Sequence, residues 1–489
     1  MRQSQSQRSA LARARRAVAK LFVPLALAPL LGGCLFLGTE KPDAALDVPK
    51  HYRLAAGRHD AALPSVIWWR GFRSAQLTGL VEESLTSNLD IAAAVARIVQ
   101  ADAQARVAGA TLLPAIDADV DVSRSRSSGT TGGGIGTPSY RSSHSVVFSA
   151  SYELDFWGKN RARLRAAEDT AVASRFEREV VALTVVASVA NAYFLVQSAH
   201  DRLNTARNNL AAAVRVYNLV DERFKVGTAS ALDTAQQESL VNQLRAALPL
   251  LEQQLRENIA SLAVLMGRAP AHFRIGLTGM APIAIPPVTP GLPSDLLTQR
   301  PDIRQAEAEL AAANADVEAA RAAMLPSITL TADGGYASAA LRTLLRPESA
   351  LFSIAAGLTQ PIFDGGRLLG QLDLTRGRQD ELLQLYRRSV VSAFGDVERA
   401  LIAVQQSTRR ERLQREVVRS SRTAFEISET RLREGAVDLV TVLNTQQSLF
   451  QADDNLAQAR LARLQAVVAL FQALGGGWPL PPKRTVAAQ

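Results

Sequence analysis

The stretch Arg431-Leu432-Arg433-Glu434-Gly435-Ala436-Val437-Asp438 interrupts a run of helix-forming residues that extends from about residue 368 to residue 474. Ala, Leu, Gln, Glu and Arg dominate both sides of it, and Gly435 can adopt a positive φ without a Cβ clash. We therefore expect Gly435 to form the turn of a long antiparallel helical hairpin. The stretch Arg223-Phe224-Lys225-Val226-Gly227, followed by Ser230-Ala231-Leu232-Asp233, predicts a second hairpin that turns at Gly227.

The apolar residues before Gly227 and before Gly435 recur with a period of seven residues. Apolar side chains recur at Phe224, Tyr217, Leu210 and Leu203, and again at Leu432, Phe425 and Val418. This spacing predicts coiled-coil packing, although two ordinary amphipathic bundle helices would have a similar composition. Length favours the coiled coil, because residues 161–224 would form a helix on the order of 90 Å long, beyond the usual size in a compact domain.

Two segments change from helical spacing to strict alternation. Apolar residues alternate with Asp117, Asp119 and Asp121 in the first segment, and the pattern resumes up to Glu153; the second segment includes Asp333. A two-residue period is typical of strands. We therefore predict four strands at about 115–124, 144–154, 327–336 and 352–362, forming two β-hairpins with one apolar face and one polar, acidic face.

The order of these features indicates a duplication. Long helices are expected at 161–224 and 368–432, returning helices at 229–266 and 437–474, and leading helices at 76–110 and 295–324. The predicted division is a lipoprotein signal peptide at 1–33, a lipidated linker at 34–75, a first repeat at 76–266, a Pro-rich linker at 267–294, a second repeat at 295–478 and a tail at 479–489.

The N-terminus has the pattern of an export signal. Six basic residues precede an apolar run at 21–31 that is too short to span a bilayer. The following Leu31-Gly32-Gly33-Cys34 resembles the cleavage box of bacterial lipoproteins, and this resemblance implies a covalent lipid on Cys34 and sorting to the outer membrane. Because Cys34 is the single cysteine, intrachain disulfides are excluded.

The net charge of +9 depends strongly on this signal. Its removal leaves 49 basic and 46 acidic residues, a net charge of +3. The remaining excess is small, so the composition gives no reason to expect a nucleic-acid partner.

The strands require more than one chain. Their length suits transmembrane β-strands, but an open sheet edge in lipid would leave backbone groups unpaired, and membrane barrels have at least about eight strands. A dimer would supply about eight strands and a trimer about twelve, and only the larger barrel leaves room for water. The acidic faces favour the water-filled homotrimer, with the helices continuing the barrel as a helical tube. The predicted fold class is thus mainly α with a membrane β-barrel.

Several motifs, in this order and spacing, resemble the outer-membrane factor family, the TolC-like exit ducts of tripartite efflux systems, and especially its lipoprotein branch of the NodT/OprM type. They are Trp68-Trp69, Asn88-Leu89-Asp90-Ile91, Arg223 with Gly227, Arg300-Pro301-Asp302-Ile303, Arg431 with Gly435, and Gly475-Gly476-Gly477-Trp478. The resemblance implies a homotrimer with a twelve-stranded barrel and a helical periplasmic barrel. It also implies a periplasmic adaptor and an inner-membrane pump as partners.

The resemblance further implies a periplasmic gate shortly after the second turn. The corresponding residues are Val440, Thr441 and Asn444, where Thr441 and Asn444 replace carboxylates of family members. A weaker charge-based gate is expected, to which Asp438, Leu232 and Asp233 contribute; ordinary positions on helix surfaces are the alternative. The barrel lumen is expected to contain the strand carboxylates Asp117, Asp119, Asp121, Glu153 and Asp333, which favour cations.

No catalytic constellation is visible. The five histidines lack metal-ligand spacing, and no Walker loop or nucleophile elbow is present. We expect neither enzyme activity nor a cofactor. The leading interpretation is a passive outer-membrane exit channel of an efflux system driven by an RND-type pump. A type I protein-secretion duct and a coiled-coil envelope lipoprotein without a pore are the alternatives.

Overall fold

The computed structural model describes residues 48–49, 52, 67–126, 128, 140–288, 291 and 293–477. Cys34, the predicted signal peptide and the tail at 479–489 lie outside these described residues. The elements, in chain order, are η2 (Trp68–Phe72), α2 (Ala75–Ser87), α3 (Leu89–Ala110), β1 (Ala115–Arg126), β2 (Tyr140–Leu154), α4 (Lys159–Lys225), α5 (Ala231–Leu265), η3 (Pro270–His272), α6 (Pro293–Gln299), α7 (Pro301–Ala322), β3 (Ser327–Ser338), η4 (Leu341–Thr343), η5 (Pro347–Ser349), β4 (Ala350–Thr359), α8 (Arg367–Arg433), α9 (Leu439–Ala473) and η6 (Gly475–Gly477).

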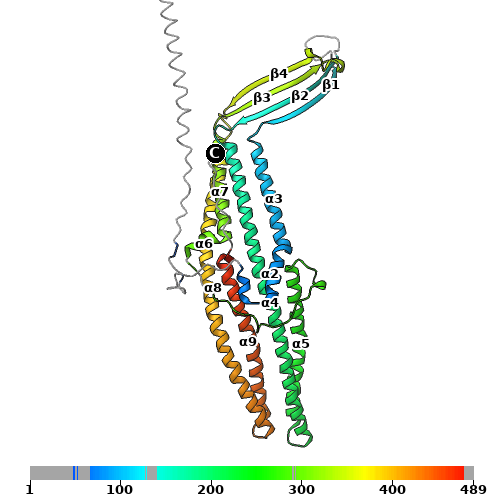
Figure 1. The fold of residues 1–489 in the computed structure, drawn as a ribbon, viewed down its shortest axis with the longest axis vertical. Helices are drawn as coiled ribbons and strands as arrows, with labels where there is room; N and C mark the ends of the chain where they lie inside the picture. Colours follow the sequence, from blue (N-terminus) through cyan, green and yellow to red (C-terminus); the bar gives the residue numbers. More distant parts are fainter. Residues whose placement is uncertain are drawn as a thin grey trace, which may run out of the picture. The chain divides into compact units, whose positions relative to one another are not determined.

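The duplication is visible in the lengths of the helices. Helices α4 and α8 both contain 67 residues, α5 and α9 both contain 35, and α3 and α7 both contain 22. Each α4 residue has its counterpart 208 positions later, since Lys159 corresponds to Arg367 and Lys225 to Arg433. The two helical hairpins, α4 with α5 and α8 with α9, are therefore structural repeats of each other (Figure 1).

The leading helix of each repeat is interrupted, which corrects the prediction of continuous helices at 76–110 and 295–324. Asn88 separates α2 from α3, and its buried side chain accepts hydrogen bonds from the backbone of Asp90 and Ile91 while donating to the carbonyl of Leu265. In the second repeat, Arg300 separates α6 from α7, which begins at Pro301. Asx capping and the proline ring both start a new helix, and the tertiary contact of Asn88 strengthens its break.

The chain forms two compact units, each built from both repeats. One unit contains residues 102–170 and 309–383, and therefore the strands and the adjoining helix ends. The other contains residues 45–101, 171–308 and 384–489, and therefore the helical hairpins. Each unit therefore combines segments that are far apart in the sequence.

The four strands form one antiparallel sheet in the order β1-β2-β3-β4 (Figure 1). The strand hairpin of the first repeat joins that of the second through β2 and β3, where Ala150 lies opposite Ala332. β1 pairs only with β2 and β4 only with β3 among the described strands. Both outer edges of the sheet are therefore open within one chain.

The helical unit contains the main core. Trp68 stacks on Phe471 with ring centroids 4.9 Å apart, and Phe72 packs on Phe194. α4 also contains an apolar 18-residue stretch long enough to cross a membrane, but 61% of that stretch is buried. Burial of this kind identifies α4 as a core helix.

Candidate functional site

The polar face of the sheet carries all five carboxylates predicted for the lumen. The register aligns Asp117, Ser149, Asp333 and Ser353 in one row across the four strands. Alternation then places Asp119, Asp121 and Glu153 on the same face. Ser353 donates a hydrogen bond of 3.0 Å to Asp333. The structure therefore brings the five residues together, although their place in a lumen stays a prediction.

The five carboxylates differ in their contacts. Asp117, Asp119 and Asp121 are exposed and have no ion-pair partner in the described part of the chain. Glu153 pairs with Lys159 at the start of α4, so its charge is compensated. The free negative charge of the face is concentrated on β1.

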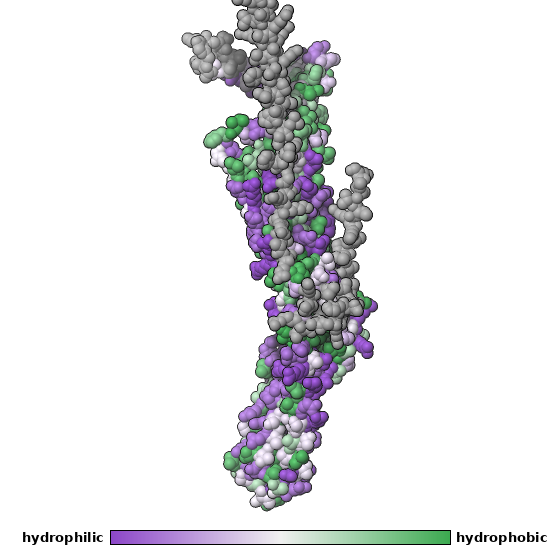
Figure 2. Space-filling view, turned by 90° about the vertical axis from the view of Figure 1, so that its left-hand side faces the viewer, coloured by the Kyte–Doolittle hydropathy of each residue, from purple (hydrophilic) through white to green (hydrophobic). Residues whose placement is uncertain are grey.

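The opposite face of the sheet is apolar and uncovered. Ile116, Phe352 and Ile354 are 71%, 84% and 82% exposed. Figure 2 shows hydrophobic residues in green interspersed with hydrophilic residues in purple on the side of the molecule that it draws. A continuous apolar face this open marks contact with lipid or another chain.

The two helical turns have equivalent backbone hydrogen bonds. In the first, Gly227 donates to Phe224 and Thr228 to the carbonyl of Arg223, at 2.9 and 2.8 Å. In the second, Gly435 donates to Leu432 and Ala436 to the carbonyl of Arg431, at 3.0 and 2.8 Å. The φ angles of Gly227 and Gly435 are 78° and 75°. The predicted turn residues thus form matching glycine-capped helix ends.

Both aspartates proposed for the gate take part in the N-terminal capping of helices. Asp438 is the N-cap of α9 and accepts hydrogen bonds from the backbone and hydroxyl of Thr441, at 2.8 and 2.6 Å. These bonds lower the pKa of Asp438 below its ordinary value. Asp233 forms a capping box with Ser230, which caps α5. Their charges are therefore already engaged in starting the two helices.

The other gate candidates are surface residues of the helix starts. Leu232 is 65% and Val440 is 49% exposed, and Thr441 and Asn444 are exposed as well. The structure does not bring the residues of one tip together with those of the other into a constriction within a single chain. Their gating role remains a prediction.

One contact joins the ends of the two long helices and was not predicted from the sequence. The guanidinium of Arg223, at the end of α4, donates a hydrogen bond to the carbonyl of Leu432, at the end of α8. This bond satisfies a helix-end carbonyl and ties the first hairpin to the second. Its counterpart Arg431 has no side-chain partner among the described residues. Repetition of Arg four residues before each turn glycine was the signal in the sequence.

A second polar feature is a buried carboxylate on α8. Glu411 is 1% exposed, accepts a 2.9 Å hydrogen bond from Arg463, and also pairs with Arg415 and, at 3.7 Å, Arg460. Burial raises the pKa of Glu411, but the hydrogen bond and the three positive charges outweigh it and hold the pKa below the ordinary value. Arg460 also donates to the carbonyl of Met280, at 2.9 Å, and so fixes the connection between the repeats.

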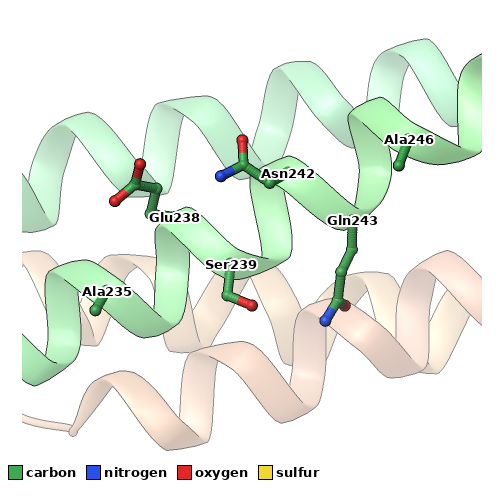
Figure 3. Close-up of a pocket in the computed structure, with 6 residues that line it drawn as sticks. All are labelled: Ala235, Glu238, Ser239, Asn242, Gln243 and Ala246. Carbon is green, nitrogen blue, oxygen red and sulfur yellow. The ribbon is translucent and has the colours of Figure 1, made fainter.

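A shallow groove follows one exposed side of α5. Figure 3 shows the six residues along successive turns of the helix, and they are Ala235, Glu238, Ser239, Asn242, Gln243 and Ala246. Ala235, Ser239, Asn242 and Ala246 have the alternating four- and three-residue spacing of a coiled-coil seam. Small side chains at such a seam can receive the side chains of another helix.

A comparison with known families identifies the architecture. The profile described as "Outer membrane efflux protein" matches residues 80–268 and 292–476, which are most of both repeats. The chain belongs to the outer membrane efflux protein family. As predicted from the sequence, it is an outer-membrane exit channel of an efflux system.

Relatives and solved structures agree with this assignment. The chain is 42% identical over 459 residues to the pyoverdine export outer membrane protein OpmQ of Pseudomonas aeruginosa, covering 92% of this chain and 96% of OpmQ. It is 33% identical over 481 residues to the toluene efflux pump outer membrane protein TtgF of Pseudomonas putida, covering 96% and 99%. The fold matches that of the outer-membrane channel OprN with a TM-score of 0.84 at 24% identity, over 90% of this chain and 99% of the other. The predicted TolC-like fold class and the family resemblance are therefore confirmed.

Proposed function

We propose that three copies of this efflux protein close a twelve-stranded barrel, in which β4 of each chain pairs with β1 of the next. The observation that carries this proposal is the four-stranded sheet with two open edges and one apolar face that is strongly exposed on its outer strands. Backbone groups at an open edge cannot remain unpaired in lipid, so the sheet has to close. The apolar face would then contact lipid and the acidic face would surround water.

The helical tips support the same ring. Arg223 of the first hairpin bonds the end of α8 in the second hairpin, whereas the equivalent Arg431 has no such partner among the described residues of its own chain. In a closed ring the second hairpin is followed by the first hairpin of the next chain. Arg431 would then donate to the carbonyl of Phe224 of that chain, and the α5 groove would receive a neighbouring helix.

The trimer would act as a passive conduit that is loaded by a periplasmic adaptor and an RND-type inner-membrane pump. We propose small organic molecules as its cargo and pyoverdine as the first one to test, because the relative at 42% identity is named for its export. We further propose that the channel has no enzyme activity and needs no cofactor, since its energy would come from the pump. A nucleotide or metal requirement for conductance would contradict this.

Two measurements test the function. Purified protein in a planar bilayer should give single-channel conductance, and deletion of its gene should cause the cargo to accumulate in the cell. Loss of secretion of one protein without any change in small-molecule export would support the type I secretion duct instead. A stable chain that gives no conductance would support the structural lipoprotein.

The β1 carboxylates would make the lumen prefer cations. Replacement of Asp117, Asp119 and Asp121 by Asn keeps size and hydrogen bonding but removes three charges in each chain. We expect the reversal potential in a salt gradient to move toward zero. Replacement of Glu153, which is paired with Lys159, is the matched control and should change selectivity less. Anion preference of the unaltered channel would contradict the assignment.

For the gate, the capping roles decide the choice of variant. Asp438→Asn retains an N-cap acceptor while removing the charge, whereas Asp438→Ala removes both. If the charge of Asp438 narrows the pore, the Asn variant alone should raise conductance. If only the Ala variant changes conductance, the effect comes from a disturbed start of α9. The same pair of variants at Asp233 tests the first hairpin.

We also propose that Cys34 carries the lipid anchor. Tyr52, 1% exposed, packs in a core cluster with Leu296, Ile303 and Leu470, so the chain is fixed to the helical unit 18 residues after Cys34. Metabolic labelling with a palmitate analogue should label the unaltered protein and not Cys34→Ala. Equal labelling of both would exclude Cys34 as the site.

A further inference from the structure

The apolar face of β1 ends in two arginines. Along this face the side chains read Ile116, Ala118, Val120, Val122, Arg124 and Arg126. The apolar members are strongly exposed, with Val120 at 72% and Val122 at 70%. The row thus changes abruptly from a lipid-like to a cationic surface.

Tyr140 holds the two arginines in place. It lies opposite Arg126 in the register, and the guanidinium carbons of Arg124 and Arg126 are 5.6 and 5.5 Å from its ring centroid. Neither arginine has a carboxylate partner among the residues that the structure describes. Cation–π contacts orient guanidinium groups while leaving all their N–H donors available.

These three residues are at the end of the sheet away from the helices. β1 begins just after α3, and β2 is followed by α4, so both helix junctions are at the opposite end. The connection between β3 and β4 brings exposed Arg342 and Arg346 to the same end as Arg126. The same connection carries one exposed carboxylate, Glu348, and the acidic residues of β1 are on the other face, so the arginines outnumber the carboxylates among the described residues of this corner.

We propose that Arg124 and Arg126, oriented by Tyr140, bind phosphate groups of lipids in the outer leaflet of the membrane. The inference rests on the proposed barrel, in which the apolar face meets lipid. Planar guanidinium groups bind phosphate through paired hydrogen bonds, and Val120 and Val122 would contact the acyl chains of the same lipid. Continuity with an apolar face favours a lipid phosphate over a soluble one.

The test uses the full-length trimer in nanodiscs of phosphatidylcholine alone, with bisphosphorylated lipid A, or with dephosphorylated lipid A. Native mass spectrometry counts retained lipid A, and thermal melting measures stabilisation. The unaltered protein should retain and be stabilised by the phosphorylated form alone. The variant Arg124→Gln with Arg126→Gln should bind it about thirtyfold more weakly, as expected for losing two cations near an anionic surface.

Arg141→Gln is the matched control, because Arg141 is at the same end of the sheet but pairs with Ser125 on the opposite face. It should bind like the unaltered protein, and Tyr140→Phe should as well, since the ring remains. Equal loss in Arg141→Gln would show a general charge effect and overturn the site. Complete competition by inorganic phosphate, or equal binding of dephosphorylated lipid A, would also overturn it.

The outcome separates this site from the channel function. Conductance of each variant in a phosphatidylcholine bilayer reports whether the barrel has formed. Normal conductance with unchanged lipid A binding in the double variant overturns the phosphate site alone. Absence of trimers and conductance in the unaltered protein overturns the proposed function. Arg124→Gln alone provides a milder substitution if the double variant does not fold.

Discussion

Equivalent positions of the two helical hairpins hold an apolar pair in the first hairpin and an ionic pair in the second. In the first hairpin, Leu203 and Leu255 are buried, at 3% and 8% exposure. Their counterparts 208 positions later are Glu411 and Arg463, which form an ion pair whose carboxylate is buried and whose guanidinium is partly exposed. A duplicated backbone can therefore keep its geometry while an apolar contact is replaced by an ionic one, provided that the charge is fully paired.

The charged residues next to these pairs also differ between the two hairpins. Arg207 pairs with Glu252 in the first hairpin, whereas the equivalent residues of the second, Arg415 and Arg460, are both cationic and both pair with Glu411. In the second hairpin this network also binds the connection between the repeats, through Arg460 and Met280, a connection that Gln197 and Asp201 of the first hairpin bind as well. Arg460 thus makes a tertiary contact, whereas its counterpart Glu252 pairs with Arg207 inside the first hairpin.

The largest effect is expected when the carboxylate is placed in the wrong hairpin. Leu203→Glu would bury a charge opposite Leu255 and should destabilise the protein by on the order of 4 kcal/mol. Adding Leu255→Arg should recover part of this loss. Denaturation of the purified single and double variants measures the coupling between the two positions. No recovery in the double variant would mean that the two hairpins are not interchangeable at this position.

The reverse change removes the charge from the second hairpin. Glu411→Gln leaves Arg463, Arg415 and Arg460 without a carboxylate and should cost about 2 kcal/mol, the partial exposure of the arginines reducing the effect. The loss should be smaller at high salt, where the repelling arginines are screened. Leu203→Ala serves as the control, because its cost arises from a cavity and should not depend on salt.

Low pH should reduce the contribution of Glu411 to the stability of the second hairpin. The pKa of Glu411 is lowered in the folded protein, so its stabilising contribution is present above the unfolded-state value of about 4.3 and is lost as pH falls through the folded-state pKa. The difference in stability between the unaltered protein and Glu411→Gln should therefore shrink below about pH 4. Denaturant titrations at a series of pH values measure it. A constant difference would contradict the assigned charge state.

The tip arginines should give a smaller difference. Arg223→Ala removes a charged hydrogen bond seen within one chain, at a cost of about 1.5 kcal/mol. If the ring closes as proposed, Arg431→Ala should destabilise the trimer by a similar amount but leave the isolated chain unaffected. Trimer dissociation measured by mass photometry over a range of detergent concentrations separates the two effects. No change in trimer stability for Arg431→Ala would contradict the contact between chains.

The smallest effect is expected at the cap of the first returning helix. Asp233→Ala breaks the capping box with Ser230 and should cost about 1 kcal/mol, whereas Asp233→Asn should cost only about a few tenths, because the Asn side-chain oxygen can still accept the hydrogen bond from the backbone N–H of Ser230. Thermal melting followed by circular dichroism can detect this difference. Equal losses for both variants would indicate that the charge, rather than the cap, stabilises this turn.

The sequence determined the repeating pattern of the elements. Glycines with positive φ set the turns at Gly227 and Gly435, alternation set the four strands, and the Asp residues of β1 were assigned to the polar face, because each of these depends on residues close together in the chain. The motifs around Arg300 and Arg431 also pointed to the family. Local periodicity is sufficient for such features.

Only the tertiary structure decided which residues act on one another. It interrupted the leading helix at Asn88, whose side chain bonds Leu265, and paired Glu153 with Lys159. It also joined Arg223 to Leu432 and surrounded Glu411 with arginines from two helices. These contacts connect residues that are distant along the chain or in different elements. Their strength depends on burial and on the partners that folding supplies, which local periodicity does not record.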